Sequence, residues 1–221
     1  MKRSRITLLF LLLVFVLFQT ACHQTTNPGN DLIRSEYVIE SDAHYIDGFP
    51  ALYKNGDINA IIEIPAGSIE KWEVDKTDGK LKWEFVDGHP RNIRYLGYPA
   101  NYGMVPRTLL PESKGGDGDP LDVLVLGPPY ERGSVVRCRI IGVLYLVDRG
   151  EQDDKLIAVS LDSAFSDIDS MDELEKEFAG LKEILSIWFA NYKGPGKLSS
   201  KGFGEKEEAL AILADAIEAF E

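Results

Sequence analysis

The sequence contains little cysteine, which limits how its fold can be held together. Its 221 residues include two cysteines, Cys22 and Cys138. Cys22 lies at the end of an N-terminal apolar run that we interpret as a leader. Only Cys138 therefore remains for the folded body, and an intramolecular disulfide is excluded. Cys138 stands in the apolar segment SVVRCRIIGVLYLV, so we expect it to be a buried strand residue rather than a reactive thiol.

The sequence also has few histidines and no excess of positive charge. Its three histidines, His23, His44 and His89, lie outside the motifs described below, so a Ser-His-Asp or Cys-His catalytic arrangement has no support. Lysine and arginine number 24 against 36 aspartates and glutamates, which gives a formal net charge of −12. Nucleic-acid binding normally needs a basic surface. We therefore expect no nucleic-acid partner, and the acidic balance favours a site that uses cations.

The N-terminal apolar run is too short to span a membrane readily. The positively charged start MKRSR precedes the run from Ile6 to Phe18, and the small residues Thr20 and Ala21 follow it. This order is typical of an export signal, whereas a membrane-spanning helix needs about 20 apolar residues. We interpret residues 1–21 as a signal peptide. Its removal would take away three positive charges and move the net charge from −12 to −15.

Cys22 follows this signal directly and resembles the lipidated cysteine of bacterial lipoproteins. Those signals usually carry Leu three residues before the cysteine, where this chain has Gln19, so cleavage next to Ala21 by an ordinary signal peptidase stays open. Residues 22–45 include the polar stretch HQTTNPGNDLIRSEY and are predicted to be a flexible tether to a domain over residues 46–221. We expect an exported protein with a lipid anchor in a bacterial membrane, periplasmic or at the cell surface. A soluble periplasmic protein is the alternative.

The rest of the chain divides by its hydrophobic pattern. Between about Ile58 and Val147, short runs such as INAIIEIP and LDVLVLG alternate with turn residues, which favours a small β-barrel. From about Met171, the segments MDELEKEFAGLKEILSIWFANY and EKEEALAILADAIEAF space apolar residues by three and four, which predicts two amphipathic helices. We therefore expect a mainly β fold with α (α+β), in which helices pack on the outside of a barrel.

The stretch GGDGDPLDVLVLGPP, residues 115–129, places three aspartates immediately before an apolar strand. A calcium loop of the EF-hand kind would need oxygen ligands where this chain has Leu121 and Pro128, so that alternative fails. A surface turn rich in Asp and Gly is the simpler alternative. However, Asp122 borders the apolar run, where an unpaired carboxylate would be costly to desolvate. A cation would remove that cost, and Mg²⁺ suits carboxylate ligands.

A second acidic group follows the long apolar run that ends at Val147. It consists of Asp148, Asp153 and Asp154. If both acidic groups lie at the same rim of the barrel, several carboxylates converge there, which is tolerable only with more than one divalent ion between them. The sequence therefore predicts a site for several Mg²⁺ ions at the strand ends.

Four segments resemble the soluble family I inorganic pyrophosphatases in their order and approximate spacing: IEIPAG, YPANYG, GGDGDPLDVLVLG and GEQDDKLIAV. The resemblance extends from about Ile58 to the C-terminus. It implies a five-stranded OB-like β-barrel with flanking C-terminal helices. It also implies an inorganic diphosphatase that uses Mg²⁺ to hydrolyse pyrophosphate to two phosphates. Bacterial members commonly form hexamers, so the resemblance implies a homo-oligomer.

The resemblance further implies roles for individual residues. The metal-binding carboxylates would be Asp117, Asp122, Asp148, Asp153 and Glu63, and the general base would be Asp119. The substrate-binding residues would be Lys71, Arg91, Tyr98, Tyr102, Lys155, Tyr192 and Lys193. Either Arg91 or Arg94 fits the arginine position, and the spacing to Tyr98 favours Arg91.

These residues suit the chemistry of a small polyanion. Pyrophosphate carries several negative charges, so its hydrolysis needs cations on both phosphoryl groups and an activated nucleophile. Two Mg²⁺ ions sharing one water would activate it for in-line attack on phosphorus, while Asp119 accepts its proton. The alternative function is a lipid-anchored protein that binds a divalent cation or phosphate without turnover.

Overall fold

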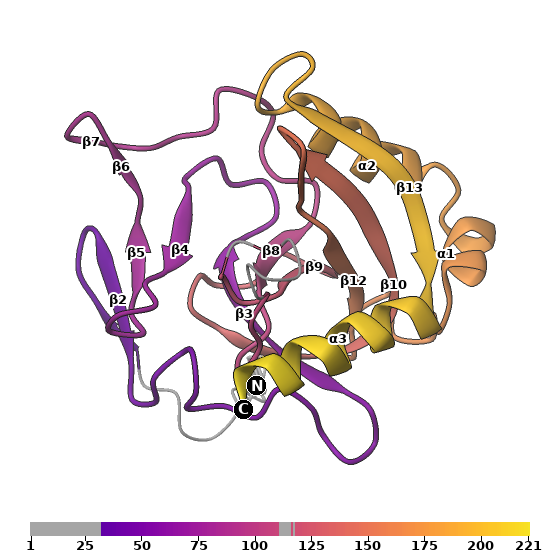
Figure 1. The fold of residues 1–221 in the computed structure, drawn as a ribbon, viewed down its shortest axis with the longest axis horizontal. Helices are drawn as coiled ribbons and strands as arrows, with labels where there is room; N and C mark the ends of the chain where they lie inside the picture. Colours follow the sequence, from indigo (N-terminus) through magenta and orange to yellow (C-terminus); the bar gives the residue numbers. More distant parts are fainter. Residues whose placement is uncertain (1–31, 111–115, 117) are drawn as a thin grey trace, which may run out of the picture.

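The computed structural model describes residues 32–110, 116 and 118–221. A five-stranded barrel consists of β3 (Ile58–Ile64), β8 (Asn101–Met104), β9 (Asp122–Leu126), β10 (Val135–Asp148) and β12 (Lys155–Ser160). The strands are hydrogen-bonded in the order β3-β8-β9-β12-β10, and pairing of β10 with β3 closes the ring (Figure 1). The predicted OB-like barrel is confirmed, and its closure leaves these five strands without a free edge.

Strand β10 closes the barrel because it bends between two neighbours. Its residues 135–138 pair with β3, and residues 138–144 pair with β12, with a register shift between Ile140 and Gly142. A bulge of this kind increases the local twist and lets a strand turn a corner. Where β8 pairs with β3, the chains approach so closely that a Cβ on Gly103 would lie 1.8 Å from the carbonyl oxygen of Ile61. Only glycine fits there without moving the backbone.

A smaller sheet lies beside the barrel. Its strands are β1 (Leu32–Arg34), β2 (Val38–Ser41), β5 (Leu81–Trp83) and β4 (Trp72–Val74), in that order across the sheet. The hairpin of β6 (Phe85–Val86) and β7 (His89–Pro90) follows β5. The structure thus differs from the tether predicted over residues 22–45, because β2 pairs with β5, and Ile39 and Tyr45 are buried. The folded body begins earlier than residue 46, since a distant strand supplies the pairing partner.

The described part of the chain has three helices, α1 (Met171–Glu177), α2 (Leu181–Asn191) and α3 (Lys206–Phe220). Helix α2 packs against β13 (Leu198–Glu205), which pairs with the end of β10, and α3 packs against β10 (Figure 1). The short strand β11 (Glu151–Gln152) forms a hairpin with β10. None of the helices in this part of the chain is long and apolar enough to cross a membrane.

The apolar pattern after Met171 predicted one continuous helix, and the structure divides it into α1 and α2. Gly180, the N-cap of α2, has a positive φ of 86°, a left-handed conformation that interrupts a right-handed helix. Ser170 caps α1 by accepting a hydrogen bond from the backbone N–H of Glu173. The spacing of the apolar residues continues across the break, so periodicity alone did not reveal it.

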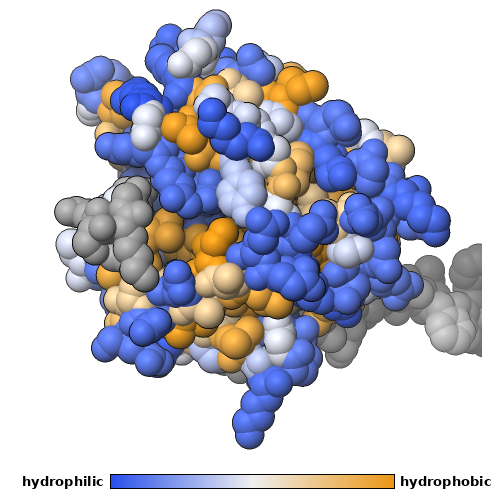
Figure 2. Space-filling view, turned by 45° about the vertical axis from the view of Figure 1, so that its right-hand side comes forward, coloured by the Kyte–Doolittle hydropathy of each residue, from blue (hydrophilic) through white to orange (hydrophobic). Residues whose placement is uncertain are grey.

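Buried side chains on the two faces of the barrel strands pack against different helices. Along β9, Leu124 and Leu126 belong to the group that contacts α1 and α2, whereas Val123 and Val125 belong to the group that contacts α3. Cys138 is fully buried, and burial raises the pKa of its thiol, so the prediction of an unreactive strand cysteine is confirmed. Figure 2 shows one outer face, on which hydrophilic residues surround an area of hydrophobic residues in the central and lower part of the view.

Candidate active site

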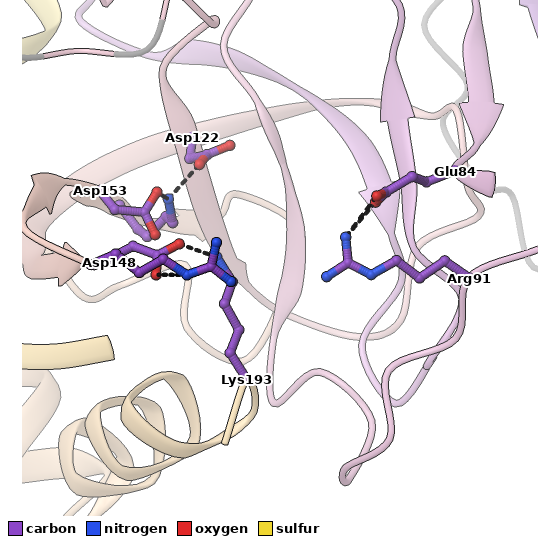
Figure 3. A network of polar contacts seen from close by, with 8 residues as sticks. Glu84, Arg91, Asp122, Asp148, Asp153 and Lys193 are labelled. Carbon is purple, nitrogen blue, oxygen red and sulfur yellow. Dashed lines mark hydrogen bonds and ion pairs between the residues drawn. The ribbon is translucent and has the colours of Figure 1, made fainter. Parts of the chain in front are cut away.

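Three predicted aspartates lie where strands of the barrel begin or end. Asp122 is the first residue of β9, Asp148 is the last residue of β10, and Asp153 stands two residues before β12. Strands β9 and β12 run parallel, so both strands begin at the same end of the barrel. Figure 3 shows the three carboxylates gathered together, with Arg91 opposite them. Asp122 from the first acidic group predicted from the sequence therefore lies with Asp148 and Asp153 from the second.

Lys155 lies between two of these aspartates. Its Nζ is 2.5 Å from Oδ2 of Asp122 and 2.6 Å from Oδ1 of Asp153, and its side chain is buried. Burial alone would lower the pKa of Lys155, but Asp122 and Asp153 outweigh burial and raise that pKa above its ordinary value. Lys155 therefore stays charged and holds together two carboxylates that would otherwise repel each other.

One carboxylate oxygen of Asp148 accepts a hydrogen bond, and the other has no hydrogen-bond partner among the described residues. Its Oδ2 accepts a hydrogen bond from Nζ of Lys193 at 2.7 Å. Its Oδ1 is buried and has no hydrogen-bond partner among the described residues, although Nε of Arg149 lies 4.0 Å away. A buried carboxylate oxygen without a partner is costly, and a cation would satisfy it.

Asp119, the predicted general base, lies on the loop before β9 with 51% of its side chain exposed. Lys76, from the turn after β4, forms an ion pair with Asp119 and donates a hydrogen bond to the carbonyl oxygen of Gly118 at 3.1 Å. Lys76 therefore links this turn to the loop that carries Asp119. Asp117 lies outside the described residues, so its role as a metal ligand stays a prediction.

The donor set fits Mg²⁺, which prefers hard oxygen ligands. The unpartnered Oδ1 of Asp148 is one such oxygen. Over residues 32–110, 116 and 118–221, no three acidic, histidine or cysteine side chains form a ready metal centre. Instead, Lys155 and Lys193 bind the carboxylates. A divalent ion must therefore share these carboxylates with the lysines or displace the ammonium groups.

Glu63 lies near the end of β3 and is 5% exposed. Its Oε1 accepts a hydrogen bond from the backbone N–H of Val74 at 2.8 Å. Burial raises the pKa of Glu63 to about 8; Lys71 opposes this shift and Asp122 adds to it. In the metal-free protein at neutral pH, Glu63 is therefore mainly protonated, and a metal ion must release that proton to use the carboxylate.

The predicted substrate-binding lysine and tyrosines are neighbours. Nζ of Lys71 lies 3.5 Å from Glu73 and 5.3 Å from the ring centre of Tyr102. The Tyr98 ring lies 5.3 Å from that of Tyr102 and 6.2 Å from that of Tyr192. Burial raises the pKa of both Tyr98 and Tyr102, so these hydroxyls stay protonated. They are available as hydrogen-bond donors to phosphate oxygens.

Arg91 is held in place by a carboxylate. Nη1 of Arg91 donates to both oxygens of Glu84, at 2.8 and 2.6 Å. Figure 3 shows the Arg91 side chain extending toward Lys193. Arg94 is exposed, whereas the charge of Arg91 acts on the buried Tyr98. Of the two arginines that the sequence left open, the geometry favours Arg91.

The family model described as "Inorganic pyrophosphatase" matches residues 60–221, which include all of the site residues described above. The chain belongs to the inorganic pyrophosphatase family. The match begins within β3 and covers the rest of the barrel and the three described helices, so β1 and β2 are the described elements that lie wholly outside it.

Known inorganic pyrophosphatases agree with this assignment. That of Xanthomonas campestris pv. campestris is 37% identical over 169 residues, which cover 74% of this chain and 89% of that protein. The structure of the Helicobacter pylori inorganic pyrophosphatase has a TM-score of 0.66 at 35% identity, covering 79% of this chain and 99% of that one. The type I inorganic pyrophosphatase of Toxoplasma gondii has a TM-score of 0.80 at 22% identity, covering 86% and 97%. At that identity, the last similarity supports the fold alone.

Sequence reasoning missed two side chains that support this pyrophosphatase site. They are Glu84, which orients Arg91, and Lys76, which pairs with Asp119. Glu84 and Lys76 stand in short charged segments that carry no motif. Asp154, which the sequence grouped with the converging carboxylates, has a different role. It is buried, and its oxygens accept hydrogen bonds from the backbone N–H of Leu146 at 3.0 Å and the side chain of Gln152 at 2.6 Å. Asp154 therefore supports the β10–β11 hairpin.

Proposed function

We propose that this protein is an enzyme that hydrolyses inorganic pyrophosphate to two phosphates. The observation that carries the proposal is the match to the inorganic pyrophosphatase family over residues 60–221. The same residues bring carboxylates and cations together at one end of the barrel, as Figure 3 shows. A compact polyanion needs both kinds of group, because it must be neutralised and its nucleophile must be activated.

Mg²⁺ is the proposed cofactor, held by Asp117, Asp122, Asp148, Asp153 and Glu63. When bound, it would act as a Lewis acid on the phosphoryl oxygens and lower the pKa of the attacking water. The protein supplies the remaining groups. Asp119 accepts the proton of the water that attacks phosphorus in line, and Lys155 keeps Asp122 and Asp153 in position.

The cationic and hydroxyl groups of the site bind the substrate. Positive charge comes from Lys71, Arg91 and Lys193, and hydroxyl donors come from Tyr98, Tyr102 and Tyr192. These groups neutralise the departing phosphate as negative charge develops on it, and no covalent nucleophile is required. Because Glu84 fixes Arg91 and Asp148 fixes Lys193, the cations are oriented before substrate arrives.

Release of phosphate from pyrophosphate tests the proposal. The purified wild-type protein with Mg²⁺ should release phosphate, and Asp119→Asn should remain folded and bind Mg²⁺ but lose at least about a hundredfold in turnover, since a general base contributes on this scale. A folded wild-type protein that binds metal without turnover would instead support the alternative, a cation- or phosphate-binding protein.

We also propose export and a lipid anchor at Cys22. Residues 1–21 and Cys22 lie outside the described residues, so this proposal rests on the sequence pattern. Metabolic labelling with palmitate should mark the wild type and not Cys22→Ala, and retained labelling in the variant would contradict it. Fractionation and protease access on intact cells would distinguish an anchored protein from a soluble periplasmic one.

A homo-oligomer, of hexamer size by family resemblance, is the proposed assembly. On α2, Ile184 and Ile187 are 59% and 61% exposed, and Leu96 is 74% exposed. The carbonyl oxygen of Leu96 accepts a hydrogen bond from the Trp188 side chain of α2, so Leu96 lies next to this helix. Exposed large apolar side chains that gather in this way favour a protein contact. Sedimentation velocity should show an oligomer that Ile187→Lys weakens, whereas a wild-type monomer at micromolar concentration would contradict the proposal.

A further inference from the structure

The turn between β10 and β11 carries an unexpected residue. Arg149 and Gly150 are its two central residues, because Asp148 pairs with Glu151 across the hairpin. Both have positive φ, 52° for Arg149 and 101° for Gly150. Such turns favour Asn, Asp or Gly, since a long side chain is strained in the left-handed region. An arginine kept at a strained position points to a use for its guanidinium group.

A second positive charge lies directly opposite this arginine. The pairing of β10 with β13 ends where Asp148 lies opposite Leu198. The next two residues face each other in the same way, because the backbone N–H of Arg149 donates a hydrogen bond of 3.0 Å to the carbonyl oxygen of Lys197. Like charges at directly opposed positions destabilise a sheet. Two basic residues thus stand opposite each other in a chain that has 36 acidic residues against 24 basic ones.

Few carboxylates lie near Arg149 and Lys197 in the described part of the chain. There, Lys197 has no carboxylate within ion-pair distance, and the only one near Arg149 is Asp148, whose Oδ1 is 4.0 Å from Nε. The Arg149 side chain is 71% exposed, so this contact leaves the guanidinium open to solvent. Two exposed basic residues at opposed backbone positions are therefore available as hydrogen-bond donors to an anion.

Their position identifies the kind of anion. Asp148, which neighbours Arg149, accepts a hydrogen bond from Lys193, one of the cations assigned to substrate phosphate. Arg149 is thus linked through Asp148 to a cation assigned to substrate phosphate, and Lys197 lies opposite Arg149 on the neighbouring strand. We infer that Arg149 and Lys197 form an outer phosphoryl subsite, which binds the third phosphoryl group of a linear tripolyphosphate. This inference rests on the proposed pyrophosphate hydrolysis at the adjoining site.

The chemistry is the same as with pyrophosphate. The oxygen of water forms a bond to phosphorus, one P–O–P bond breaks, and the bridging oxygen leaves with the electron pair. The water proton passes to Asp119, and the products are one phosphate and one pyrophosphate, so no further reactant is needed. A guanidinium group suits this role because it binds two phosphate oxygens at once.

Steady-state kinetics with both substrates tests the inference. The ratio of kcat/KM for tripolyphosphate to that for pyrophosphate should fall about tenfold in Arg149→Gln and in Lys197→Gln, as expected for loss of one charged hydrogen bond. Tripolyphosphate should also inhibit pyrophosphate hydrolysis, with an inhibition constant about tenfold higher in the variants. The second measurement reports binding even where tripolyphosphate is turned over slowly.

Three further arms make the result decisive. Arg149→Gly relieves the backbone strain at this turn, so it should fold at least as well as wild type and still lose the tripolyphosphate preference. Lys201→Gln, an exposed lysine on the same strand β13, should leave the ratio as in wild type. Inhibition of pyrophosphate hydrolysis by orthophosphate tests whether the two residues bind only the free product. If the variants weaken only this inhibition, the inference is wrong. It is also wrong if the ratio of kcat/KM for tripolyphosphate to that for pyrophosphate changes less than twofold. A wild type inactive on pyrophosphate would instead refute the proposed function.

Discussion

Replacement of Glu63 by glutamine should change how the stability of the metal-free protein depends on pH. The pKa of Glu63 is raised from an ordinary value of 4.5 to about 8, mainly by burial. Between these pH values, the folded state holds a proton that the unfolded state has released. The stability that this bound proton contributes is therefore fully present below pH 4.5, falls by about 1.4 kcal/mol per pH unit above it, and is lost once pH has risen through about 8.

The size of the effect follows from this shift. Between pH 5 and pH 8, ionisation of Glu63 in the unfolded state should cost the wild type about 3 kcal/mol of unfolding free energy. Glutamine does not ionise, and its amide oxygen can accept the same hydrogen bond from Val74 that the carboxylate accepts. Glu63→Gln should thus resemble the wild type at pH 5 and exceed its stability at pH 8 by about 3 kcal/mol.

Urea unfolding followed by circular dichroism, in EDTA at pH 5, 6, 7 and 8, measures this difference. Glu73→Gln is the matched control, because it removes a neighbouring carboxylate that is 52% exposed and also lies near Lys71. The control should keep most of the pH dependence of the wild type, because Glu73 is the smallest of the contributions that shift the Glu63 pKa. If Glu63→Gln has the same slope with pH as the wild type, then Glu63 is already ionised in the folded protein, and the account of its burial is refuted.

Three other changes test the site and the fold. Asp122→Asn should lower turnover at saturating Mg²⁺ at least about a hundredfold in initial-rate assays, which corresponds to roughly 2.7 kcal/mol. Asp172→Asn, on the surface of α1, should not lower it. Equal losses in the two variants would mean that the metal site is misplaced. Glu84→Gln should raise KM for pyrophosphate about tenfold, because it weakens the two hydrogen bonds that orient Arg91; an unchanged KM would contradict that role. Gly103→Ala should destabilise the protein by about 2 kcal/mol or more in urea unfolding, since its Cβ would meet a backbone oxygen; wild-type stability would show that β8 and β3 can separate freely.

The sequence predicted the fold well where local pattern and motif agreed. Alternating and continuous apolar runs marked β3, β9 and β10, and the structure joins them in a closed five-stranded barrel. Local pattern failed at residues 32–45, which were predicted to be a tether although β2 pairs with β5, and at Gly180, where one apolar repeat runs through two helices. Pairing between distant segments and a single backbone conformation leave little trace in hydrophobic periodicity.

The types of residue in the site were determined by the sequence itself. Aspartates next to apolar strands, the family-like segments around Glu63 and Tyr98, and the acidic composition all pointed to a cation-dependent site for phosphate chemistry. Those features are local, because a carboxylate beside a buried strand needs a partner wherever the strand lies in the fold.

Which groups meet was decided only by the tertiary structure. Parallel pairing of β9 with β12 brings Lys155 between Asp122 and Asp153. The segment after α2 brings Lys193 to Asp148, and the nearby Asp154 accepts a backbone hydrogen bond instead. Burial and the surrounding charges, which arise when distant strands assemble, raise the pKa of Glu63 to about 8. Desolvation and Coulomb interactions depend on distances in space rather than on separation along the chain, so the sequence alone could not supply them.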